Sequence, residues 1–119
     1  MHELSIAHNI VDIVHQYVEE ERLPLVQHVS VQIGVLSGVV SDSLEFNFEA
    51  LVADTSLGNA RLRIVHVPFV IQCHACGTAS ELETGIAVCP HCGSVKTQTL
   101  SGSELQVMEI VVNEPEVAA

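Results

Sequence analysis

Two Cys-x-x-Cys pairs constrain the fold of this chain more than any other feature. Cys73 pairs with Cys76 and Cys89 with Cys92, and twelve residues separate the two pairs. Each pair can curl its backbone so that both sulfurs face one ion, and two pairs supply four thiolates in a tetrahedron, the ligand set of structural zinc sites. The spacing therefore predicts a zinc-ribbon module with a structural zinc ion held by Cys73, Cys76, Cys89 and Cys92.

The residues around the cysteines support this interpretation. Gly77 and Gly93 directly follow the second cysteine of each pair, where glycine allows a tight turn. The twelve-residue spacer is predicted to form a β-hairpin. Large apolar residues are scarce from Gln72 to Lys96, so folding of this segment should depend on metal. Four protein ligands leave no open position for water, which argues against a catalytic metal.

Other roles of the cysteines are weaker alternatives. An iron site for electron transfer lacks the aromatic packing expected around it. A thiol redox switch stays open on sequence grounds. His74 and His91 lie inside the two pairs; we interpret them as exposed loop histidines, and the alternative is that one of them replaces a thiolate or tunes the metal.

Hydrophobic periodicity predicts two helices and three strands around the module. An amphipathic helix is predicted over residues 3–21, because apolar residues recur at helical spacing until Pro24. A second helix is predicted to begin at Ser41 or Asp42, with one of these as its N-cap, and to end before Leu57. Alternating apolar residues predict the strands, which cover residues 28–35, 61–67 and 104–112.

The first predicted helix has an apolar face and a polar face. Its apolar face holds Leu4, Ala7, Val11, Val14 and Val18. On the other face His8, Asp12 and His15 lie at positions i, i+4 and i+7, as metal ligands sometimes do; we interpret them as a solvated polar face. His28 and His66 are predicted to be packing histidines in strands.

The last predicted strand needs a sheet to join, and the only candidate sheet precedes the cysteines. We therefore predict an α+β fold, with a small three-stranded sheet, two helices and an inserted zinc-ribbon module. The predicted domains are an α+β domain of residues 1–68 and 104–119 and a zinc-ribbon domain of residues 69–103.

Composition limits the functions open to the chain. The net charge is -11, from 4 basic and 15 acidic residues, and aromatic residues make up 3%. Such a chain lacks the basic surface that nucleic acids require, and anionic membranes should repel it. No stretch approaches roughly 20 apolar residues, and no secretion signal is recognised. We expect a cytoplasmic protein, where paired cysteines favour metal binding over disulfides.

The N-terminal Met1-His2-Glu3 offers a second kind of metal chemistry. The terminal amine of Met1, the amide nitrogen of His2 and its imidazole can form adjacent chelate rings, and the amide or carboxylate of Glu3 adds a donor. A square plane of nitrogen and oxygen suits Ni²⁺ or Cu²⁺. On spacing alone this site is weakly supported, because many chains begin with such residues.

The two signals together resemble the HypA/HybF family of hydrogenase nickel-incorporation proteins. The chain opens Met-His-Glu-Leu-Ser-Ile, and its second half carries Cys-x-x-Cys and Cys-Pro-x-Cys. A final strand follows, ending Ile110-Val111-Val112-Asn113-Glu114. The resemblance covers nearly the whole chain.

This resemblance implies a function that the residues alone do not. It implies weak nickel binding by Met1, His2 and Glu3 in a nickel-binding α+β domain, and zinc binding by the four cysteines. The implied partners are a HypB-type GTPase and the large subunit of [NiFe]-hydrogenase, and in some organisms urease and its accessory proteins. The implied role is delivery of Ni(II), not catalysis.

Two alternatives compete with this interpretation. A zinc-ribbon adaptor for protein–protein interaction, without a nickel role, fits the composition equally well, and only the N-terminal motif argues against it. A nucleic-acid-binding zinc ribbon is opposed by the charge of -11. The sequence also leaves open whether two chains form a homodimer, for example by exchanging the module.

Overall fold

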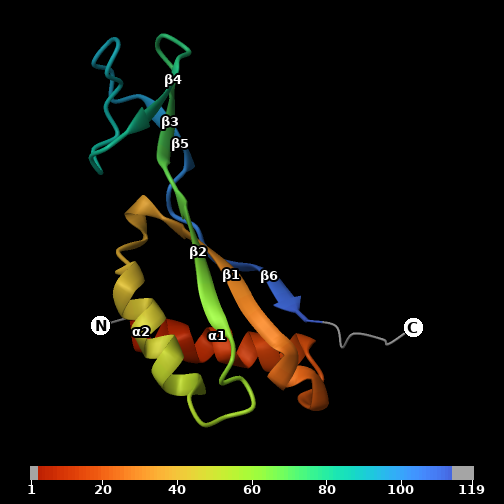
Figure 1. Cartoon of the computed structure of the whole chain (residues 1–119). Helices are drawn as coiled ribbons and strands as arrows, with labels where there is room; N and C mark the ends of the chain where they lie inside the picture. Colours follow the sequence, from red (N-terminus) through yellow and green to blue (C-terminus); the bar gives the residue numbers. More distant parts are fainter. Residues whose placement is uncertain (1–2, 114–119) are drawn as a thin grey trace. The chain divides into compact units, whose positions relative to one another are not determined.

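The structure is a computed structural model, and it describes residues 3–113. The predicted α+β class is confirmed: two α-helices accompany one three-stranded sheet, and a second three-stranded sheet lies in the part of the chain that contains the cysteines (Figure 1). The elements are α1 (Glu3–Tyr17), the 3-10 helix η1 (Glu20–Leu25), β1 (Val26–Gly34), the 3-10 helix η2 (Val35–Ser37), α2 (Ser41–Val52), β2 (Arg61–Val67), β3 (Phe69–Cys73), β4 (Ala79–Leu82), β5 (Thr97–Ser101) and β6 (Leu105–Val112).

Helix α1 is shorter than the predicted helix over residues 3–21. It ends at Tyr17, and the backbone of Glu19 is extended, with φ -62° and ψ 147°. Three consecutive glutamates begin at Glu19, and negative charge at a helix C-terminus opposes the helix dipole. The chain instead forms η1, which includes Pro24.

The buried face of α1 is centred one position away from the predicted face. Ala7 and Val14 are buried as expected, and Glu3 and Ile10 are buried with them. Leu4 is 49% exposed, so its assignment to the core is wrong. At about 100° per residue, Leu4 lies roughly a quarter turn from the centre of the buried face.

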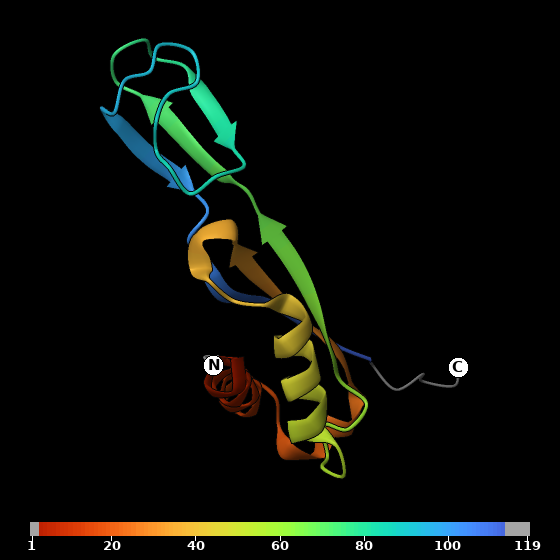
Figure 2. The same cartoon turned by 90° about the vertical axis from the view of Figure 1, so that its left-hand side faces the viewer.

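Helix α2 packs against α1 through residues at helical spacing. Leu44, Phe48 and Val52 are buried at i, i+4 and i+8, and the two helices contact each other and cross at a steep angle (Figures 1 and 2). The prediction that Ser41 or Asp42 caps the helix is wrong. Val40 is the N-cap residue and makes no side-chain cap, and its carbonyl accepts the first helical bond.

Strand β1 is the central strand of the larger sheet. The strand order is β2-β1-β6, so the strand that follows the cysteines does join the sheet that precedes them, as predicted. The alternating residues Val29, Val31 and Ile33 are buried. In contrast, His66 in β2 is exposed, which contradicts its prediction as a packing histidine, while His28 is half-buried.

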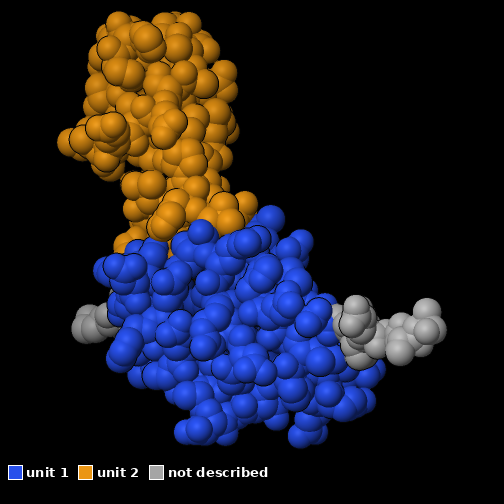
Figure 3. Space-filling view, viewed as in Figure 1, with its two compact units in different colours: residues 1–31, 39–64, 107–119 blue, residues 32–38, 65–106 orange. Residues whose placement is uncertain are grey.

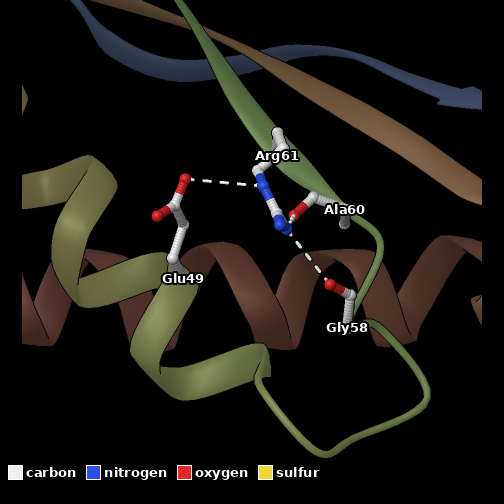
Figure 4. Close-up of polar contacts among 4 residues, drawn as sticks. All are labelled: Glu49, Gly58, Ala60 and Arg61. Atoms are coloured by element: carbon white, nitrogen blue, oxygen red, sulfur yellow. Dashed lines mark hydrogen bonds and ion pairs between the residues drawn. The ribbon is translucent and has the colours of Figure 1, made fainter.

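A surface contact joins the end of α2 to the start of β2 (Figure 4). Arg61 Nε lies 3.5 Å from Glu49 Oε1, and its Nη1 donates hydrogen bonds to the carbonyls of Gly58 (3.1 Å) and Ala60 (2.8 Å). Both charged side chains are more than half exposed, at 57% and 53%. Exposed ion pairs contribute about 0–1 kcal/mol, so this contact orients the turn more than it stabilises the fold.

The smaller sheet was only partly foreseen. Its order is β4-β3-β5, and β3 pairs antiparallel with both neighbours. The predicted hairpin in the spacer is wrong, because β4 is the spacer's one strand and pairs with β3 instead. Phe69 and Ile71 of β3 are buried, and this two-residue apolar signal was too short to predict a strand.

A close backbone crossing ties residues 34–36 to residues 102–104. The amides of Gly34 and Leu36 donate to the carbonyls of Glu104 and Gly102, each at 2.7 Å. A Cβ atom on Gly34 would lie 2.0 Å from the Gly102 carbonyl oxygen, and one on Gly102, whose φ is +123°, would lie 2.8 Å from Phe69 Cα. Only glycine fits at these two positions.

The described residues group into two compact units (Figure 3). Unit 1 takes its residues from 1–31, 39–64 and 107–119, and unit 2 from 32–38 and 65–106. The division into a domain of residues 1–68 and 104–119 and a domain of residues 69–103 stays a prediction. Within residues 3–113, no helix is long and apolar enough to cross a membrane.

We predict that two phenylalanines on α2 differ sharply in their contribution to stability. Phe48 is fully buried and Phe46 is 72% exposed. Phe48→Ala should lower the free energy of unfolding by about 3–5 kcal/mol, through lost burial and a cavity, whereas Phe46→Ala should change it by less than about 0.5 kcal/mol. Urea unfolding followed by helical circular dichroism would measure both. Equal midpoints for the two variants would contradict the packing described for α2.

Candidate metal centre

The four cysteine sulfurs converge on one point in unit 2. The Sγ atoms of Cys73, Cys76, Cys89 and Cys92 all lie within 4.8 Å of one another. The Cys73–Cys92 pair is 3.5 Å apart and the Cys76–Cys89 pair 3.7 Å. A tetrahedral ion with metal–sulfur bonds of about 2.3 Å requires sulfur–sulfur distances of about 3.8 Å. This group, called the four-cysteine cluster below, can therefore hold a metal ion, and all four cysteines are free thiols.

The two cysteine turns repeat the same backbone hydrogen bonds. In the first turn, Cys73 N donates to Thr78 O at 3.0 Å and Gly77 N donates to Cys73 O at 2.9 Å. In the second turn, Cys89 N donates to Ser94 O at 3.0 Å and Gly93 N donates to Cys89 O at 2.8 Å. Both glycines have left-handed backbone, with φ of 77° and 74°. The predicted requirement for glycine after each pair is confirmed.

Backbone amides and the Thr78 hydroxyl lower the pKa of two of the thiols, Cys73 and Cys76. The amides of Cys76 and Ala75 approach Cys73 Sγ at 3.4 and 3.3 Å. The Cys76 amide contributes most to lowering the pKa of Cys73. The Thr78 hydroxyl, followed by the Thr78 amide, lowers the pKa of Cys76 to about 6. Hydrogen bonds to a thiolate favour the charged form that binds metal.

Cys92 behaves in the opposite way. The Ser94 amide lowers its pKa, but the Cys73 sulfur, desolvation and the other two sulfurs together raise it to about 12. Four negative sulfurs this close repel one another, and a divalent cation removes that repulsion. The protein groups therefore prepare the cluster for a cation.

Burial closes the cluster from one side. Cys73 and Cys89, the first cysteine of each turn, are buried, while Cys76 and Cys92 are exposed. Cys73 is the last residue of β3. Four protein ligands fill a tetrahedral ion, which suits a structural role more than catalysis.

The predicted nickel residues are only partly described. Met1 and His2 lie outside the described residues. Glu3 is the first residue of α1 and is 5% exposed. The amide of Val40, the N-cap of α2, donates to Glu3 Oε2 at 3.3 Å. Sequence reasoning missed this contact, because 37 residues separate the two and no motif marks Val40.

The remaining histidines are not gathered into a cluster. Among residues 3–113, the four-cysteine cluster is the only group of three or more His, Cys, Asp or Glu side chains whose donor atoms lie together. His74 and His91 are exposed, as expected for loop histidines. His8, Asp12 and His15 are exposed on α1.

We predict that metal binding by the four-cysteine cluster weakens as pH falls. Metal requires thiolates, so binding releases the proton of Cys92, whose pKa is raised to about 12, at every pH below that value. Below about pH 6 Cys76 is also protonated, because its pKa is about 6, so the affinity should fall more steeply there. Competition with a coloured chelator from about pH 5 to about pH 8 would measure the slope. Affinity that does not change with pH would contradict thiolate ligation.

Comparison with known proteins places the chain in one family. A family model described as hydrogenase/urease nickel incorporation, metallochaperone, hypA matches residues 1–112. The hydrogenase maturation factor HypA of Chloroflexus aggregans is 40% identical over 111 residues, covering 92% of this chain and 97% of that protein. HypA of Geobacter metallireducens is 41% identical over 112 residues, covering 94% and 99%.

A solved structure shares the fold. The solution structure of the Ni metallochaperone HypA from Helicobacter pylori aligns with a TM-score of 0.63 at 20% identity, covering 97% of this chain and 100% of that one. At this identity the likeness concerns the fold alone, whereas the family model and the curated relatives span nearly the whole sequence. The chain therefore belongs to the HypA family of hydrogenase/urease nickel incorporation metallochaperones.

Proposed function

We propose that this protein delivers Ni(II) for the maturation of [NiFe]-hydrogenase, and of urease where that enzyme is present, while a structural zinc ion folds its cysteine module. The family match over residues 1–112 carries the proposal. It also favours nickel delivery over a zinc-ribbon adaptor without a nickel role. The proposed zinc ligands are Cys73, Cys76, Cys89 and Cys92, in a zinc-ribbon domain of residues 69–103.

The geometry of the four-cysteine cluster supports zinc. Sulfur–sulfur distances of 3.5 and 3.7 Å match a tetrahedron, and Zn²⁺ accepts four thiolates without a geometric preference of its own. The domain also needs the ion. Its buried apolar side chains are few, and two of the four are ligands: Phe69, Ile71, Cys73 and Cys89. Metal ligation then replaces the missing core.

The proposed nickel donors are the terminal amine of Met1, the amide and imidazole of His2, and Glu3. The Glu3 carboxylate already accepts the Val40 amide and is nearly buried. This favours the main-chain amide of Glu3 as the donor, with its carboxylate anchoring the start of α2. A site with few donors binds nickel weakly enough to release it, whereas four thiolates bind zinc tightly.

Partners would provide selectivity and direction. Affinity order alone favours Cu²⁺ at a nitrogen site, so nickel specificity must come from metal supply and from partner proteins. We propose a HypB-type GTPase as the nickel source and the hydrogenase large subunit as the recipient, in the cytoplasm. The net charge of -11 would attract basic partner surfaces and cations. The protein carries metal and does not catalyse a reaction.

We predict that zinc removal unfolds the β4-β3-β5 sheet and leaves unit 1 folded. Cys73→Ser should lose one zinc ion per chain, because the remaining three thiolates cannot close the tetrahedron. Hydrogen exchange should then show lost amide protection in Phe69–Cys73 and Thr97–Ser101, while α1 and α2 stay protected. Thr99→Ser, a conservative change in β5, serves as the control. Full zinc content in Cys73→Ser would contradict the proposed ligand set.

We predict that the first equivalent of Ni²⁺ binds at the N-terminus. Zinc-loaded protein with a native N-terminus should develop the absorption of square-planar nickel, and His2→Ala and a variant extended by two residues before Met1 should both lose it. Glu3→Gln should keep it if the Glu3 carboxylate is not a ligand. Zinc content is checked in every sample.

The outcomes separate the donors. If His2→Ala loses nickel binding and the extended variant keeps it, the His2 imidazole is a ligand and the terminal amine is not. If Glu3→Gln loses nickel binding while α2 stays folded, the Glu3 carboxylate is a nickel ligand. Equal nickel binding by all variants would refute the terminal site.

A further inference from the structure

The outward face of α1 carries three metal-ligating side chains that the proposed function does not use. His8, Asp12 and His15 stand at positions i, i+4 and i+7 of one helix, and all three are exposed. The residues that α1 buries lie on the opposite face. The sequence alone favoured a solvated polar face, but three observations on α1 bear on the choice.

The first observation is the unbroken helix. α1 runs from Glu3 to Tyr17 without interruption, so the backbone positions of the three side chains are fixed relative to one another. At about 100° per residue they fall within a sector of roughly 60°. Asp12 is one turn from each histidine, and residues three or four apart have Cβ atoms about 5–6 Å apart. An ion above Asp12 is therefore within reach of both imidazoles.

The second observation is that the three side chains are unengaged. In the part of the chain from residue 3 to residue 113, no hydrogen bond or ion pair involves the side chains of His8, Asp12 or His15. Their donor atoms are available without breaking an existing contact.

The third observation is the composition of the helix. α1 contains no Lys or Arg, and its other carboxylate, Glu3, is buried. Solvated helix faces commonly pair acidic with basic residues at these spacings. Among the α1 residues three or four positions from Asp12, the two histidines are the only ionisable ones, an arrangement suited to a cation that arrives from solution.

We propose that His8, Asp12 and His15 form a second, weak divalent-metal site on α1, which accepts borderline transition-metal ions such as Ni²⁺. Two imidazoles and one carboxylate suit this class of ion, and water completes the coordination. The donor atoms are not gathered before binding, since only the four-cysteine cluster has that property among the described residues. Ordering three free side chains costs entropy, so the site exchanges its ion readily.

This site does not depend on the proposed terminal site. His8 is five residues beyond Glu3, which corresponds to about 7.5 Å along the helix axis. Its ligands are nitrogen, oxygen and water, which favour paramagnetic octahedral nickel. The proposed terminal site is a square plane and gives diamagnetic nickel, so the two sites have different signatures.

The test uses zinc-loaded His2→Ala protein titrated with Ni²⁺ alone. Calorimetry counts the bound ions, and NMR line broadening locates them. We expect one ion to bind and to broaden the amide signals of residues 8–15. Adding His8→Ala and His15→Ala should abolish this binding or weaken it at least tenfold. Asn9→Ala with Gln16→Ala, two exposed polar residues on the same helix, should leave it unchanged.

Three results would overturn the proposal. These are no nickel binding by His2→Ala protein, equal binding after both α1 histidines are removed, or broadening confined to residues outside α1. The terminal site is judged separately, by comparing wild-type protein with His2→Ala. The side chains of His8, Asn9, His15 and Gln16 are exposed, and helical circular dichroism checks that each variant folds.

Discussion

The convergence of four sulfur atoms within 4.8 Å is the constraint on which unit 2 depends. Beside the buried sulfurs, the sheet β4-β3-β5 places only Phe69 and Ile71 in its interior. Backbone hydrogen bonds within the two cysteine turns set the positions of the sulfurs, and amides in the first turn donate to Cys73 Sγ. Four thiolates this close repel one another, so the four-cysteine cluster suits a cation. A metal ion bound there would take the place that a hydrophobic core takes elsewhere.

Backbone contacts between distant segments fix the rest of the fold. The crossing of Gly34 and Gly102 joins the end of β1 to the short segment between β5 and β6. A few residues later, Val40 begins α2 and donates its amide to Glu3. Unit 1, in contrast, has a conventional apolar core, in which α1 and α2 present residues at helical spacing and β1 presents alternating ones.

The metal-binding groups of the chain are of two types, thiolates on one hand and nitrogen and oxygen donors on the other. Soft thiolates in a closed tetrahedron suit an ion that stays, whereas nitrogen and oxygen donors at exposed positions suit an ion that leaves. The acidic composition raises the local concentration of cations around both kinds of donor. The nickel delivery that we propose needs this separation, because a ligand set that bound nickel as firmly as four thiolates bind zinc would not release it.

The sequence by itself determined the metal-binding module, the α+β class and the family. Cysteine spacing, glycine positions and hydrophobic periodicity are local signals, and Gly77, Ala7 and Val14 behave as those signals predict. It could not determine features that depend on contacts between distant residues. The capping of α2 at Val40, the pairing of β4 with β3 and the engagement of Glu3 each involve partners that no local pattern marks. Only the tertiary structure decided these, because register and capping follow from which segments meet in space.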